Sequence, residues 1–166
     1  DGSTFTNVDF DDVCITMINP NIAKTLNKKI KDASNQFGSL LDILVDEKTE
    51  NTILLPPIRG NAKDPAKKTF WTFIDKDLEV KQDGLAFGLN VEKHNHGNAI
   101  SYLKTNVARY ALSILKISMN SHRGEFKYVP LVDFNQSWND DKLCELLSIT
   151  NKEYQEILRV IPKYYD

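Results

Sequence analysis

The sequence is poor in cysteine and has no long apolar run. Its two cysteines are Cys14, in a strand-like stretch, and Cys144, on a helix-like face. This placement favours two free thiols over a disulfide. No apolar stretch approaches the roughly 18–20 residues that span a bilayer, and no signal-peptide pattern opens the chain. These absences predict a protein of the reducing cytoplasm.

The motifs of several common enzyme chemistries are also missing. The sequence has no Gly-rich phosphate loop, no Cys-x-x-Cys and no His-Glu-x-x-His. His94 and His96 are close together, but no cysteine or carboxylate cluster completes a set of metal ligands beside them. The run Asp9, Asp11 and Asp12 is typical of a solvated loop. We therefore expect no catalytic residue, no metal site and no cofactor in this chain.

Positive charge is not in excess either, because the formal net charge is −2. A stand-alone nucleic-acid-binding domain is usually basic. The charge is uneven, however: from Lys93 to Tyr128 there are six Lys or Arg and one acid, which is +5. From Val129 to Asp166 there are four bases and seven acids, which is −3. A total near zero can therefore hide a basic face.

The composition supports a folded protein. Hydrophobic residues make up 41% of the 166 residues and aromatic residues 10%, which is enough for a packed interior. We expect a single domain over 1–166, with a strand-rich half (1–92) and a helical half (93–166). The chain begins at Asp1 without an initiator methionine, and we expect it to be a fragment of a longer protein.

Strand-like and helix-like segments are mixed along the chain, which predicts an α+β fold: a short mixed or antiparallel sheet with packed helices. β-rich runs predict strands over 13–18, 53–55, 70–74, 85–91 and 126–134. Asp83–Gly84 is typical of a turn between the third and fourth of these. Pro130 makes the last run an edge strand or a bent strand.

An amphipathic helix is expected over 20–33, with Asn19 as its N-cap and Pro20 at its first position. Its apolar residues recur every four positions and form one stripe, and lysines occupy another face. These lysines are Lys24, Lys28 and Lys31. A short helix is expected over 40–45.

Three helices are expected in the C-terminal half. Apolar residues recur at three or four from 98 to 119, which predicts one long helix. Two short helices should follow, the first capped by Asn139 and ending at Leu147. The second is opened by a capping box between Thr150 and Glu153 and stopped by Pro162.

Basic residues gather in two places that we predict to contact DNA. The first is a loop containing Gly and Pro, which could clamp phosphates or enter a groove. The second is the predicted long helix and the residues after it. The candidate contacts are Arg59, Lys63, Lys67 and Lys68 in the loop, and Lys104, Arg109, Lys116, His122 and Arg123 in the helical group.

An ordered series of short motifs runs through the C-terminal part. It comprises Asn98–Thr105, Arg109–Ser113, Leu115–Ile117, Tyr128–Phe134, Trp138–Leu143 and Leu147–Thr150, followed by Glu153 and Ile157. This series resembles the C-terminal, target-recognition region of bacterial type II (type IIG-like) restriction-modification enzymes that methylate adenine. The N-terminal half matches more loosely: Phe10–Ile18 resembles the strand that follows the catalytic domain in that family, and Ile53–Gly60 and Phe70–Ile74 are similar in order and spacing.

The resemblance implies a division of labour. In that family an N-terminal Rossmann-like domain binds S-adenosylmethionine, flips an adenine and methylates its exocyclic nitrogen with an Asn/Asp-Pro-Pro-Tyr/Phe motif. Leu55–Ile58 does not match this motif, because it lacks the leading amide or acid and the aromatic residue. The chain would then be the region after the catalytic domain. Its implied partners are double-stranded DNA and that methyltransferase domain.

The resemblance leaves two other functions open. One is a protein-interaction module that docks the catalytic domain or a second subunit, which the net negative charge favours. The other is a metal-dependent nuclease that uses Glu125 and Lys127 with an upstream Asp. The apolar motif residues Val129–Leu131 and Trp138 are expected to lock the terminal helices onto the sheet rather than to touch DNA.

Overall fold

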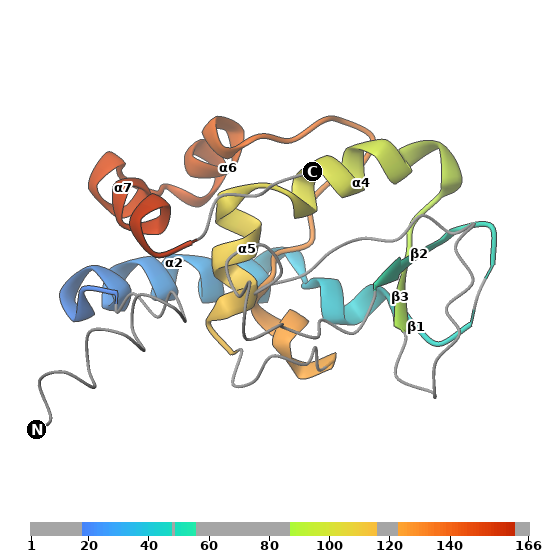
Figure 1. Cartoon of the computed structure of the whole chain (residues 1–166), viewed down its shortest axis with the longest axis horizontal. Coiled ribbons are helices and arrows are strands. Elements are labelled where there is room, and N and C mark those ends of the chain that lie inside the picture. The colour runs from blue at the N-terminus through green and yellow to red at the C-terminus, as the bar shows by residue number, and fades with distance from the viewer. Residues whose placement is uncertain (1–17, 48, 56–86, 116–122, 162–166) are drawn as a thin grey trace, which may run out of the picture.

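Helices and one small antiparallel sheet form the part of the chain described by the computed structural model, which comprises residues 18–47, 49–55, 87–115 and 123–161 (Figure 1). The predicted α+β class is confirmed. The α-helices are α2 (Pro20–Phe37), α4 (His96–Leu103), α5 (Asn106–Ser113), α6 (Asp140–Leu147) and α7 (Asn151–Val160). Short 3-10 helices are η1 (Leu40–Ile43), η2 (Lys93–Asn95) and η3 (Arg123–Tyr128). The strands are β1 (Leu44–Val45), β2 (Thr52–Leu55) and β3 (Phe87–Asn90).

Helix α2 begins where the sequence predicts it and runs four residues further, to Phe37. The Asn19 side chain accepts a hydrogen bond from the backbone N–H of Asn21 at 3.0 Å, which satisfies a donor of the first turn. Leu26 and Ile30 are fully buried and anchor the apolar stripe. The helix ends at Gly38, whose φ of 84° is a conformation that favours glycine.

The sheet has the order β1-β3-β2, and both pairings are antiparallel. Leu89 of β3 faces Leu44 on one side and Ile53 on the other, and its side chain is fully buried. The sheet lies at one end of the molecule, beyond η1 (Figure 1). The strands predicted at 53–55 and 85–91 are thus confirmed within the described residues. Those predicted at 70–74 and, except for Ile18, at 13–18 lie outside them.

The predicted single helix over 98–119 is wrong, because the chain breaks between α4 and α5. Thr105 is extended (φ −64°, ψ 151°) and its hydroxyl accepts a hydrogen bond from the Ala108 N–H at 3.2 Å. Asp140 of α6 also accepts from the Val107 N–H at 3.0 Å. The apolar spacing continues across the break from Leu103 to Val107, so periodicity alone does not show it. Residues 116–119 lie outside the described part.

The strand predicted over 126–134 is also wrong. Its first residues belong to η3, and the following chain makes a single isolated bridge, between Pro130 and Ser39. Proline has no N–H to donate to a strand ladder. The Pro130 carbonyl instead accepts a hydrogen bond from the Tyr102 hydroxyl at 2.5 Å, which attaches this segment to α4.

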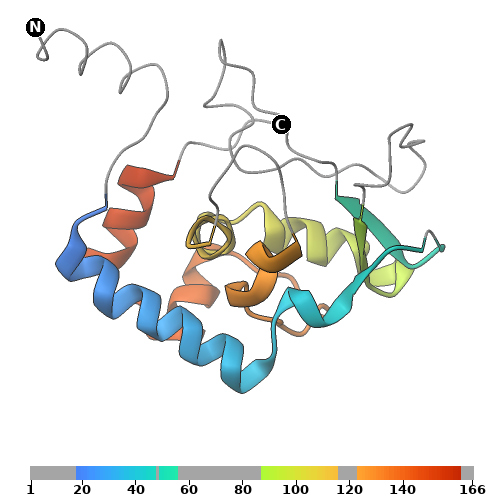
Figure 2. The same ribbon diagram turned by 90° about the horizontal axis from the view of Figure 1, so that it is seen from below.

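Both predicted C-terminal helices are confirmed, including the Asn139 cap and the Thr150–Glu153 capping box. Helix α7 packs beside α2 (Figure 2). The buried Glu153 carboxylate accepts hydrogen bonds from its own cap, at Thr150 N (2.9 Å), and from Lys29 Nζ of α2 (2.5 Å). It also accepts one from the Thr25 hydroxyl at 3.1 Å. One side chain therefore caps α7 and fixes it to α2.

A second glutamate fixes the start of α2. Glu156 accepts a hydrogen bond from the Asn19 backbone N–H at 2.8 Å and pairs with Arg159. The hydrogen bonds from Arg159 and Asn19 lower the pKa of Glu156 to about 2. Burial on its own raises the pKa of Glu153, but the hydrogen bonds from Lys29, Thr150 and Thr25 outweigh it and the pKa is lowered. Both carboxylates are thus held in their charged form.

Acid should weaken this junction between α2 and α7. The stabilisation by Glu156 is complete above its ordinary pKa of 4.5 and is lost as the pH falls from 4.5 towards about 2. We expect the free energy of unfolding, measured by urea titration at stepped pH, to decrease over this window. The decrease should be less steep in Glu156→Gln, which cannot titrate there. An equal slope in the variant and the wild type would contradict this account.

The sheet should not tolerate a side chain at Gly88 of β3. An added Cβ would lie 2.2 Å from Thr52 Cγ2 and 2.9 Å from the backbone oxygen of Ile53. We expect Gly88→Ala to lower the free energy of unfolding by about 1–3 kcal/mol, as overpacking does. The control is Gly97→Ala in α4, where nothing lies within 4 Å. Equal stability of the two variants would contradict the close approach of β2 and β3.

Candidate nucleic-acid interface

The structure describes three of the nine predicted DNA contacts. Lys104 follows the end of α4 and is half-buried, and Arg123 is exposed at the start of η3, where it forms an ion pair with Asp46. Arg109 lies on α5, so the three residues belong to separate elements. The remaining candidates lie outside the described residues; they are Arg59, Lys63, Lys67, Lys68, Lys116 and His122.

The position of Arg109 corrects its predicted role. The prediction made it a DNA contact on one long helix, but its side chain is only 4% exposed. It lies on α5 between buried residues, and α5 packs against η3, which carries the buried Glu125. A charge in the interior is stable only with compensation from other groups. Arg109 is thus a residue of the core and is not placed to contact a phosphate.

The motif segment from Val129 to Trp138 is internal only in part, because residues 133 and 135–137 are exposed. Val129 and Phe134 are buried, and the Phe134 ring lies 5.8 Å from that of Tyr102, centroid to centroid. The Trp138 indole N–H donates to the Asp133 carbonyl at 2.8 Å. These contacts agree with the expected structural role of the segment. The contact with Tyr102 attaches the segment to α4, whereas the prediction had it hold the terminal helices against the sheet.

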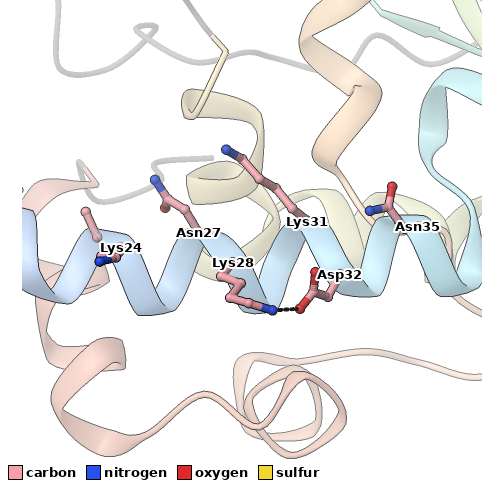
Figure 3. Close-up of a pocket in the computed structure, with 7 residues that line it drawn as sticks. Lys24, Asn27, Lys28, Lys31, Asp32 and Asn35 are labelled. Carbon is pink, nitrogen blue, oxygen red and sulfur yellow. Dashed lines mark hydrogen bonds and ion pairs between the residues drawn. The ribbon is translucent and has the colours of Figure 1, made fainter.

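A group of basic residues that the candidate contacts did not include lies on α2 and η3; Lys31 is half-buried and the other members are exposed. We call it the lysine face, and its members are Lys24, Lys28, Lys31 and Lys127. The α2 lysines are spaced by four and three residues, so they lie on one side of the helix. With Asn27 and Asn35 they line a surface hollow of ≈ 510 Å³ (Figure 3). The sequence shows the spacing of these lysines, but an ordinary solvated helix face has the same spacing. The spacing alone therefore does not identify a binding surface.

The acid content of this face is low. Lys28 Nζ lies 2.6 Å from Asp32 Oδ2 across one turn, and Lys31 extends away from that pair (Figure 3). Among the described residues, no carboxylate lies within ion-pair distance of Lys24, Lys31 or Lys127. These three ammonium groups therefore carry charge that no acid in the described ranges neutralises at close range.

Lys31 and Lys127 approach the same aromatic ring. The Lys31 Nζ lies 5.0 Å from the centroid of Tyr128 and the Lys127 Nζ lies 5.6 Å from it, both within the range of a cation–π interaction. Tyr128 is half-buried and packs against the hydrophobic core. The ring thus holds two positive charges, from α2 and η3, at the surface of the protein.

A second hollow, of ≈ 640 Å³, lies beside β2 and η2 and has a mixed lining. It contains Glu50 and Glu92 together with Lys93 and His94. His94 and His96 do not act as a pair here, because the His96 Nε2 lies 2.8 Å from the Val91 carbonyl, while His94 contacts Glu92. In the described ranges, no three His, Cys, Asp or Glu side chains gather as metal ligands would.

The geometry gives little support to the nuclease alternative. Glu125 is 2% exposed and lies on η3, whereas Lys127 is exposed. Two-metal and one-metal nucleases need carboxylates that converge on an open position. Within residues 18–47, 49–55, 87–115 and 123–161, Glu125 belongs to no such cluster.

Comparisons of the chain with family models, with characterised proteins and with solved structures found no match. The resemblance drawn from the C-terminal motifs therefore stays a prediction. No helix in the described part of the chain is long and apolar enough to cross a membrane.

The internal position of Arg109 predicts a loss of stability on substitution. Arg109→Met removes a buried charge from α5, which packs against η3 and its buried Glu125, and we expect the free energy of unfolding to fall by about 3–5 kcal/mol. The double variant Arg109→Met/Glu125→Leu should recover part of this loss, because it removes both charges. Urea titration of the wild type, Arg109→Met, Glu125→Leu and the double variant gives the coupling energy. Additive losses would contradict a shared buried environment.

Proposed function

We propose that the chain is a double-stranded DNA-recognition module of a bacterial adenine-specific DNA methyltransferase of the restriction-modification type. The observation that carries DNA binding is the lysine face, which concentrates positive charge on a protein whose net charge is −2. The attachment to a methyltransferase depends on the resemblance of the C-terminal motifs. S-adenosylmethionine and the methyl transfer would belong to a catalytic domain that precedes the region represented here.

The shape of the lysine face suits a polyanion. From Lys24 to Lys31 an α-helix rises about 10 Å, because each residue adds about 1.5 Å. Duplex DNA carries one negative charge per roughly 1.7 Å of its axis, so a rigid row of this length faces several phosphates. Asn27 and Asn35 add amide donors in the same hollow. Such contacts hold a duplex in register without reading its sequence.

Sequence-specific recognition needs further side chains at the base edges. The predicted loop with Arg59, Lys63, Lys67 and Lys68 remains our candidate for these contacts. A base-flipping enzyme must hold the duplex while the base leaves the stack. We propose that the lysine face supplies this hold and that the loop supplies specificity.

Charge reversal on the lysine face tests the function. We expect the full 166-residue chain to bind a 30-base-pair duplex, followed by fluorescence anisotropy, with an affinity that falls steeply as salt increases. Lys24→Glu/Lys28→Glu should weaken binding by roughly tenfold or more at fixed salt. The matched control is Lys142→Glu/Lys152→Glu, which makes the same charge change on α6 and α7. Urea titration checks that both variants are folded.

The comparison of the two charge-reversal variants separates electrostatic contact at the lysine face from the effect of net charge. Equal weakening by both pairs would mean that only the net charge matters and would contradict the lysine face. No salt-dependent binding by the wild-type chain would contradict the proposed function. Sequencing of the bound members of a randomised pool asks whether binding is sequence-specific.

Exposed leucines on the two C-terminal helices favour the docking module as a second candidate. Leu146 of α6 is 39% exposed and Leu158 of α7 is 42% exposed, on helices that together carry five acids and three bases. Contiguous exposed apolar patches mark protein interfaces, whereas single exposed apolar residues are ordinary. Docking would be supported as the main role by three results together. The chain binds the separately expressed catalytic domain, Leu146→Ser/Leu158→Ser abolishes that binding, and the chain does not bind DNA.

A further inference from the structure

Two ammonium groups lie near one aromatic ring at the lysine face, where Lys31 and Tyr128 are half-buried and Lys127 is exposed. Lys31 reaches Tyr128 from α2, and Lys127 is its neighbour in η3. The two charges repel each other, and the negative face of the ring compensates for only part of this repulsion. None of the acids in the described residues lies within ion-pair distance of either ammonium. Glu125, the nearest acid along η3, is 2% exposed.

The ring also limits the freedom of both lysines. A lysine at a surface loses much rotamer entropy when it binds a ligand, which weakens the contact. Contact with Tyr128 holds part of each side chain in place beforehand. The ring in turn is fixed, because Tyr128 packs against the core and Val129 beside it is buried. Lys31 and Lys127 are therefore more ordered than freely solvated lysines would be.

We infer that Lys31, Tyr128 and Lys127 form a binding subsite for one phosphodiester group of duplex DNA. The two ammonium groups bind the same phosphate, and Tyr128 is a positioning residue that holds them. This inference deepens the proposed function and rests on it. It differs from a general basic surface, because it assigns one phosphate to two lysines from separate elements. The contact would set the register of the duplex along α2.

The dependence of affinity on salt can count the phosphates. Each phosphate neutralised contributes about 0.9 to the slope of log K against log salt concentration. We expect the double variant Lys31→Gln/Lys127→Gln of the full chain to lose about 0.9 from this slope, because both lysines serve one phosphate. Two independent contacts would instead remove about 1.8. The matched control is Lys142→Gln/Lys152→Gln, which should leave the slope unchanged.

The role of Tyr128 needs variants that keep its bulk. Tyr128→Phe retains the aromatic face and should bind like the wild type. Tyr128→Leu retains an apolar side chain but loses the cation–π contacts, and we expect its affinity to fall on the order of fivefold. In the free wild-type protein, NMR should show the ε-methylene protons of Lys31 and Lys127 displaced by the ring current. This displacement should persist in Tyr128→Phe and vanish in Tyr128→Leu.

The results distinguish failure of this subsite from failure of the proposed function. In one case the wild type binds the duplex, and the slope of Lys31→Gln/Lys127→Gln is unchanged or is lower by about 1.8. Either result would contradict the shared phosphate and would leave DNA binding unaffected. Equal affinities of Tyr128→Leu and Tyr128→Phe would remove Tyr128 from the subsite. A wild-type chain that binds phosphatidylserine vesicles but no duplex would overturn both proposals.

Discussion

The hydrogen bonds of Glu153 fix how α2 is turned, and the exposed surface depends on that rotation. The carboxylate caps α7 and accepts from Lys29 and Thr25 of α2. Of the lysines on α2, Lys29 is thereby directed towards α7 and is held by an acid. The same rotation places Lys24 and Lys28 on the solvent side. If α2 were rotated about its axis by one residue, a different lysine would be buried and the lysines of the lysine face would no longer lie on one side.

The fold also separates the two kinds of charge in space. Helices α6 and α7 together carry five acids and three bases, and several of the acids bind other parts of the protein: Asp140 binds the start of α5, Glu153 binds α2, and Glu156 binds its N-cap, Asn19. Acids that are engaged in this way contribute to the net charge of −2 without covering the lysine face. A near-neutral protein can therefore present a local positive field, which is the quantity that a polyanion senses.

Local signals in the sequence predicted much of the fold, because they act within a few residues. The Asn19 cap, the Asn139 cap and the Thr150–Glu153 capping box placed their helices correctly. The break before α5 could not be found in this way, since one of its hydrogen bonds comes from Asp140, which is distant in the sequence. The segment at Pro130 was predicted wrongly for a similar reason: its pairing is limited to one isolated bridge with the distant Ser39, and β-rich composition does not show how far pairing extends.

The candidate site was harder to predict, because exposure rather than residue type decides it. Arg109 and Lys31 are both basic residues on amphipathic helices, yet one is in the core and the other is at the surface. The Lys31–Tyr128–Lys127 group joins two elements far apart in the chain, so no spacing rule brings its members together. The six predicted contacts outside the described residues remain predictions.

The cap that Asp140 provides to α5 has a consequence for the order of folding. Asp140 accepts hydrogen bonds from the Val107 N–H, the Asn106 side-chain amide and the Tyr154 hydroxyl. A helix of eight residues is too short to persist alone in water. The first turn of α5 is therefore completed only after the chain has closed a loop to α6, at an entropic cost that grows with loop length. The middle and the C-terminus of the protein should consequently gain their structure together, as one cooperative unit, and a nascent chain still lacking its last helices would leave α5 unformed.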